Sequence, residues 1–118
     1  MEIERLNIWK LAVELAKDVY VLTEKFPKKE LYSLTDQIRR AAVSVPSNIA
    51  EGKGRSSAKD FINFLSVARG SLYELITQLY IAREIGYLTQ EDFSTLQKRI
   101  EDLSHKIVAM TKYLRNNK

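Results

Sequence analysis

Apolar residues recur at alternating steps of three and four along four separate stretches of this 118-residue chain. That spacing places them on one face of an α-helix and predicts one helix for each stretch. The four apolar seams consist of Ile8, Ala12, Leu15, Val19, Leu22 and Phe26; Leu31, Leu34, Ile38, Ala41 and Val45; Ala58, Phe61, Leu65, Ala68, Leu72, Leu75, Leu79 and Ala82; and Phe93, Leu96, Ile100, Leu103, Ile107, Met110 and Leu114. The predicted helices cover residues 8–26, 31–52, 58–85 and 90–115.

The connections between these seams are short and hold the helix breakers. We therefore expect an all-α fold, an antiparallel up-down four-helix bundle, formed by residues 1–118 as a single domain. Asn7, Ser57 and Thr89 are the expected N-caps. Pro46 lies inside the second predicted helix, where it removes a backbone donor and crowds the preceding turn. This predicts a kink at Pro46 or a break followed by a restart.

Composition narrows the class of protein. The chain has no Cys, a single His and a net charge of +4, so it offers neither disulfides nor a helix-borne pair of metal-binding histidines. No apolar run approaches the roughly 18 residues of a membrane span, and the first residues are acidic. We expect a cytoplasmic protein that does not span a membrane and binds neither a metal nor a cofactor. Charge is distributed unevenly along the chain: the net charge is −2, +5, −3 and +4 over residues 1–24, 25–69, 70–97 and 98–118.

The helices carry more apolar side chains than one seam requires. A helix that is apolar on two sides is usually buried on two sides, which predicts a homo-oligomer. The alternative is a wide core stripe with scattered exposed tyrosines. The expected interface residues are Trp9, Val13, Tyr20, Val67, Gly70, Tyr73, Tyr80 and Ile81.

The sequence also resembles a known family. The motifs that carry the resemblance are the Trp9 region, Phe26-Pro27, Gln37 to Ala42, Ser44 to Gly52, Ala68 to Ser71 with Glu74, and the Gly86-Tyr87-Leu88 turn. Over nearly its whole length the chain resembles the bacterial four-helix-bundle proteins named after reading frames inside intervening sequences of 23S ribosomal RNA genes. The resemblance implies a ring-like homopentamer. It also implies a relation to the accessory variability proteins of diversity-generating retroelements, which associate with nucleic acid and a reverse transcriptase.

Two groups of polar residues are candidate sites. A cationic surface for phosphates is expected from Arg39, Arg40, Lys53, Arg55, Lys59 and Arg69. The alternative is that these side chains are solvated or pair with Glu51, Asp60 and Glu74. The second group, which we interpret as a hydrogen-bonded network between the second and third helices rather than a small pocket, comprises Gln37, Ser44, Asn48, Glu51, Ser71 and Glu74.

Patterns typical of enzymes are weak in this chain. Ser56 to Lys59 matches a bare Ser-x-x-Lys pattern without its companion motifs, and the segment Gly52 to Arg55 lacks the spacing of a phosphate-binding loop. Arg99 and His105 resemble the pair used by metal-independent helical ribonucleases. Six residues along a helix differ by about 120° in direction, so this pair converges poorly without a second subunit.

The sequence therefore predicts a non-enzymatic, homo-oligomeric four-helix bundle that binds RNA or DNA through basic surfaces. The alternative is a protein-binding scaffold or accessory subunit with no role in nucleic-acid binding. A metal-independent ribonuclease is the remote alternative.

Overall fold

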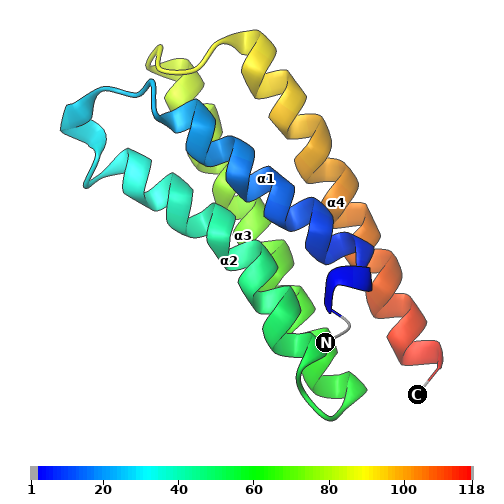
Figure 1. Ribbon diagram of the computed structural model, residues 1–118. Helices are drawn as coiled ribbons and strands as arrows, with labels where there is room; N and C mark the ends of the chain where they lie inside the picture. Colours follow the sequence, from blue (N-terminus) through cyan, green and yellow to red (C-terminus); the bar gives the residue numbers. More distant parts are fainter. Residues whose placement is uncertain (1–2, 118) are drawn as a thin grey trace.

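The computed structural model describes residues 3–117, which form four long α-helices and two short 3-10 helices (Figure 1). The elements are η1 (Ile3–Arg5), α1 (Asn7–Thr23), η2 (Lys28–Glu30), α2 (Leu34–Lys53), α3 (Ala58–Glu84) and α4 (Gln90–Asn116). Figure 1 shows the long helices side by side, with successive helices running in opposite directions. The α1–α2 and α3–α4 connections share one end of the bundle. The α2–α3 turn lies at the other end, near the start of α1 and the end of α4.

The predicted seams point inward and form one hydrophobic core along the bundle. Most seam residues are buried, because each seam meets the seams of its neighbours and loses its contact with water. Leu31 is an exception, since it lies in the connection before α2 and is 43% exposed.

The first two helices are shorter than expected. α1 ends at Thr23 rather than at residue 26, and the amides of Lys25 and Phe26 donate to carbonyls three residues back. Pro27 contributes to the early end, because it has no amide hydrogen to donate to the Thr23 carbonyl and disfavours helical geometry at Phe26. The chain then forms η2 before α2 begins at Leu34, three residues later than predicted.

Two of the three predicted N-caps are confirmed. The hydroxyls of Ser57 and Thr89 accept hydrogen bonds from the amides of Asp60 and Asp92, at 3.1 and 3.0 Å. The prediction of Asn7 as a cap is wrong. α1 starts one residue earlier than expected, so the N-cap position falls on Leu6, whose side chain makes no capping hydrogen bond.

α2 continues through Pro46 without a break, and Pro46 is buried. Two residues after Pro46, the side-chain amide of Asn48 donates to the Ser44 carbonyl at 2.8 Å. A bend of the helix axis at Pro46 stays a prediction.

Gly86 ends α3 with the left-handed conformation that favours glycine, at a φ of 88°. The Tyr87 amide donates to the Ala82 carbonyl and the Gly86 amide to the Arg83 carbonyl, at 2.9 and 3.0 Å. This pair of hydrogen bonds is a Schellman motif, which satisfies the free carbonyls at the end of the helix.

α2 and α3 form the most closely associated pair of helices. At Gly52 a Cβ atom would lie 2.8 Å from the Cβ of Phe64 and 2.9 Å from Cδ1 of Phe61. The Phe64 Cβ is fixed to the backbone of α3 and has no rotamer that relieves the clash. Gly52 therefore sets the distance between the two helices where α2 ends.

We expect Gly52→Ala to destabilise the bundle by about 1–3 kcal/mol, because the added methyl group overpacks the α2–α3 contact. Gly70→Ala is the matched control, since a Cβ at Gly70 meets nothing within 4 Å. It should stabilise α3 by about 0.5–1 kcal/mol through helix propensity alone. Chemical denaturation of both variants measures these free energies, and equal effects would contradict the assigned role of Gly52.

A side-chain contact joins the two connections at the upper end of the bundle. The Tyr87 hydroxyl donates to Oε2 of Glu30 at 2.8 Å, and the Ser33 hydroxyl donates to Oε1 at 2.6 Å. The hydrogen bonds from Ser33 and Tyr87 lower the pKa of Glu30 below its ordinary 4.5, and the bond to Glu30 raises the pKa of Tyr87.

Tyr87→Phe removes this contact, so the variant should unfold at a lower temperature than the wild type at neutral pH. A lowered carboxyl pKa stabilises the fold above pH 4.5, and that contribution is lost as Glu30 is protonated below it. The raised pKa of Tyr87 also stabilises the fold, but it does so below pH 10. This contribution is lost as the hydroxyl ionises above that pH. Thermal melts should therefore show the largest difference between these limits. A difference independent of pH would contradict the assignment.

Candidate functional site

The six basic residues expected to bind phosphate lie in three places rather than on one surface. Arg39 is half-buried and links α2 to α1. Its Nε donates to the Thr23 hydroxyl at 2.9 Å, and its guanidinium lies 4.7 Å from the ring centroid of Tyr20. This position makes Arg39 a structural residue. Sequence reasoning missed its partner Thr23, because a buried threonine at the end of a helix has no distinctive pattern.

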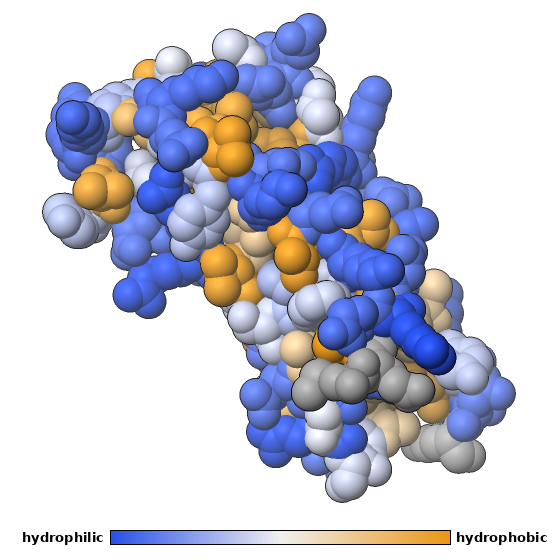
Figure 2. Space-filling model, viewed as in Figure 1, coloured by the Kyte–Doolittle hydropathy of each residue, from blue (hydrophilic) through white to orange (hydrophobic). Residues whose placement is uncertain are grey.

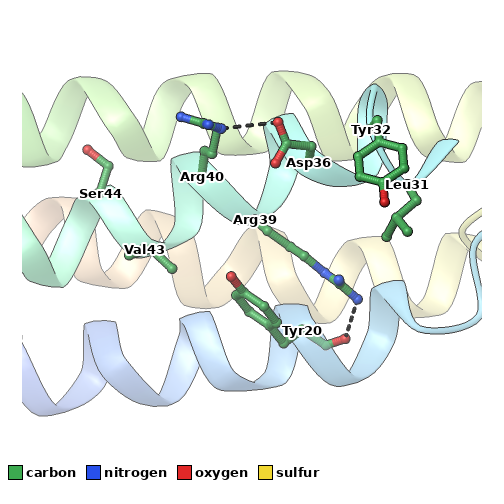
Figure 3. Close-up of a pocket in the computed structure, with 8 residues that line it drawn as sticks. All are labelled: Tyr20, Leu31, Tyr32, Asp36, Arg39, Arg40, Val43 and Ser44. Atoms are coloured by element: carbon green, nitrogen blue, oxygen red, sulfur yellow. Dashed lines mark hydrogen bonds and ion pairs between the residues drawn. The ribbon is translucent and has the colours of Figure 1, made fainter.

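Arg40 lies one residue further along α2 and points away from α1 (Figure 3). Its Nε pairs with Asp36 at 3.1 Å, and 79% of its side chain is exposed. An exposed pair on one helix is held weakly, so the guanidinium remains available to solvent.

Lys53, Arg55 and Lys59 lie together at the α2–α3 turn, and all three are exposed. Arg55 pairs with Glu51 at 2.9 Å, and its guanidinium lies 4.9 Å from the ring centroid of Phe64. The predicted pairing of Glu51 with a basic residue is thus found for Arg55.

The last turns of α4 bring two further basic residues to this end of the bundle. Lys112 and Arg115 line a surface hollow together with Ile62 of α3, which follows Lys59 by three residues. We define the basic end as Lys53, Arg55, Lys59, Lys112 and Arg115. The positive segment over residues 98–118 therefore meets the α2–α3 turn, because the antiparallel order of the helices brings the end of α4 back to this end of the bundle.

Arg69 lies further along α3, in a groove between α3 and α4, and lines the same hollow as Lys112 and Arg115 of the basic end. Its Nε donates to the Ser104 hydroxyl at 3.1 Å, and one terminal nitrogen lies 3.4 Å from the Tyr73 hydroxyl. Its guanidinium is 5.4 Å from the centroid of the Tyr73 ring. Arg69 and Tyr73 are therefore in contact with each other and exposed, on the side of the bundle away from Arg39.

The structure brings together three of the six residues expected in a network between α2 and α3. The hydroxyls of Ser44 and Ser71 are 2.8 Å apart, and the Asn48 side-chain amide lies 3.0 Å from the Ser44 hydroxyl. Glu51 turns outward to Arg55. Gln37 and Glu74 are exposed, and no side-chain hydrogen bond joins them to any described residue.

Figure 2 shows several hydrophobic patches over α1 and α2, separated by hydrophilic residues. The α1–α2 face consists of Trp9, Val13, Tyr20, Leu31, Tyr32 and Val43, all of them exposed except Trp9, which is half-buried. Two hollows lie on it. One, of about 530 Å³, is lined in part by Tyr20, Leu31 and Val43 (Figure 3). The other, of about 730 Å³, is lined in part by Trp9 and Ala50. Leu31, Tyr32 and Val43 were not predicted as interface residues.

The remaining predicted interface residues belong to α3 and face two directions. Tyr80 packs edge-on against Phe93 of α4, at a centroid distance of 5.9 Å, and Tyr73 lies in the α3–α4 groove. Val67, Gly70 and Ile81 are exposed, and helical spacing places them on the outward side of α3. The eight predicted residues therefore do not form one continuous patch.

Arg99 and His105 face different neighbours from α4. Arg99 pairs with Asp18 of α1 at 2.9 Å, whereas His105 lines a pocket in the α3–α4 groove. The two side chains therefore do not converge on one phosphate within a single chain. Between residues 3 and 117 the structure also has no cluster of three potential metal ligands among His, Cys, Asp and Glu. No helix of the described chain has the length and apolar character needed to cross a membrane.

Comparisons with known proteins give the same fold. A crystal structure of a protein of unknown function from the S23 ribosomal protein family of Bacteroides thetaiotaomicron superposes with a TM-score of 0.79 at 21% sequence identity. The match covers 89% of this chain and 98% of that one. No curated protein matches the sequence. The family model described as 23S rRNA-intervening sequence protein matches residues 4–109. Because this match spans most of the chain, the protein belongs to the 23S rRNA-intervening sequence protein family.

Proposed function

We propose that this protein is a non-enzymatic homo-oligomer that binds RNA or DNA through the basic end of each bundle. Positive charge from three helices meets at the basic end, and this observation carries the proposal. The resemblance to the family implies five copies. A symmetric ring would repeat the basic end in every subunit and so multiply its phosphate contacts.

The chemistry of the basic end supports phosphate binding rather than base recognition. Its lysines are exposed, flexible cations suited to a nucleic-acid backbone. Such contacts release counterions, so binding should fall steeply as salt rises. The separation of Arg99 from His105 supports binding without cleavage.

The α1–α2 face supports self-association. Its apolar side chains line two hollows, and exposed apolar patches often mark protein interfaces. Tyr20 and Trp9 contribute aromatic area, which is enriched at the centres of interfaces. Within the single chain the Arg39 guanidinium already lies over the Tyr20 ring and restricts its orientation.

Reversing charge at the basic end should weaken nucleic-acid binding. We expect Lys59→Glu/Lys112→Glu/Arg115→Glu to lose most affinity for RNA and DNA at moderate salt. The slope of log K against log salt should fall by about two to three. Fluorescence anisotropy over a salt series measures both quantities.

The matched control is Lys25→Glu/Lys28→Glu/Lys29→Glu, which changes the net charge equally but acts at the opposite end of the bundle. This control should retain more affinity than the basic-end variant. Equal losses would mean that net charge alone drives binding. Absence of salt-dependent binding by the wild type would favour the alternative, a protein-binding scaffold.

Assembly should depend on the α1–α2 face. Val43→Glu places a charge in the middle of this face and should shift the protein toward monomers, because a buried unpaired carboxylate is costly. Val21→Glu is the control, since Val21 is also an exposed valine but helical spacing places it away from α2. Light scattering at micromolar concentration reports the mass of each, and a monomeric wild type would overturn the assembly proposal.

A further inference from the structure

Two neighbouring hollows follow the α3–α4 groove, and Arg69 lines both of them. The lower one, of about 220 Å³, lies beside the end of α4. The upper one, of about 210 Å³, lies further along α3 toward its C-terminal end. From Ile62 to Ile76 the groove extends about 20 Å at the rise of an α-helix.

The lower hollow is positively charged. Among the described residues that line it are Lys112, Arg115 and Arg69, together with the hydroxyl-bearing Ser66 and Thr111, and none of these lining residues is a carboxylate. Three cations beside two hydroxyl groups can hold consecutive phosphates of a nucleic-acid backbone.

The upper hollow has a different chemistry. Leu72, Ile76 and Ile100 supply its apolar surface, and its polar lining consists of Gln97, Glu101, Ser104 and His105 beside Arg69. Sites for drug-sized ligands occupy about 300–1,000 Å³, so this pocket suits a smaller group. A single nucleobase has an apolar face and polar edges and matches both surfaces.

Tyr73 forms the aromatic wall of this pocket and is 56% exposed. Arg69 lies beside its ring, and the hydrogen bond to Ser104 fixes the guanidinium there. A nucleobase can therefore stack against the Tyr73 ring while Arg69 contacts the adjoining phosphate.

We infer that the α3–α4 groove is a binding site for single-stranded nucleic acid. The backbone follows Arg115, Lys112 and Arg69, and one base enters the pocket beside Tyr73. The inference rests on the proposed function and adds the class of nucleic acid and the place of contact. A positive groove that ends at an aromatic ring is typical of proteins that bind single strands. A base in a duplex is already stacked and paired, so it cannot enter the pocket.

Tyr73→Ala tests the inference most directly. The probe is a fluorescently labelled RNA or DNA of about 12 nucleotides, within the site sizes common for such proteins, in single-stranded form and as a duplex. We expect the variant to bind the single strand about tenfold more weakly and the duplex as the wild type does. Tyr73→Phe keeps the ring and should bind normally. Tyr32→Ala, which removes an exposed tyrosine from the other side of the bundle, should have no effect.

The outcomes separate the inference from the proposed function. If charge reversal at the basic end abolishes binding while Tyr73→Ala changes nothing, the proposed function stands and the base pocket is overturned. Equal losses for single strand and duplex also overturn it. If the wild type binds neither probe, both proposals fail. Light scattering on Tyr73→Ala completes the test, because loss of assembly would place Tyr73 at the subunit interface and overturn its role in base stacking.

Discussion

The close approach of α2 to α3 is the constraint on which the rest of this bundle depends. Gly52 leaves no room for a Cβ against Phe61 and Phe64, and the hydroxyls of Ser44 and Ser71 meet at 2.8 Å further along the same contact. Small residues let the two helices pack tightly, and α1 and α4 then complete the core from either side. This contact also fixes the α2–α3 turn, from which three residues of the basic end project.

The bundle places positive charge by topology rather than by clustering in sequence. α4 is long enough to return along α3 to the α2–α3 turn, so Lys112 and Arg115 reach the end that carries Lys53 and Lys59. Other arginines are used differently. Arg39 and Arg99 tie α1 to α2 and to α4, through Thr23 and Asp18. Some basic residues thus hold helices together, whereas those of the basic end remain available to bind phosphates.

The two proposed contacts use opposite sides of the molecule. The α1–α2 face offers apolar area with aromatic residues, whereas the α3–α4 groove joins cations to an exposed tyrosine. This separation lets copies of the protein associate without covering the groove. A ring built in this way would present several grooves to one strand, which raises the effective concentration for each successive contact.

The sequence by itself determined the four helices, most of the core and two of the three predicted caps, because helical periodicity and capping are local properties. It also determined the family, through motifs distributed along nearly the whole chain. Tertiary structure alone decided that Arg39 is a packing residue and that Tyr73 lies beside Arg69 in a groove. These facts depend on which helix faces lie opposite each other across the bundle, and periodicity along one helix carries no information about its neighbour.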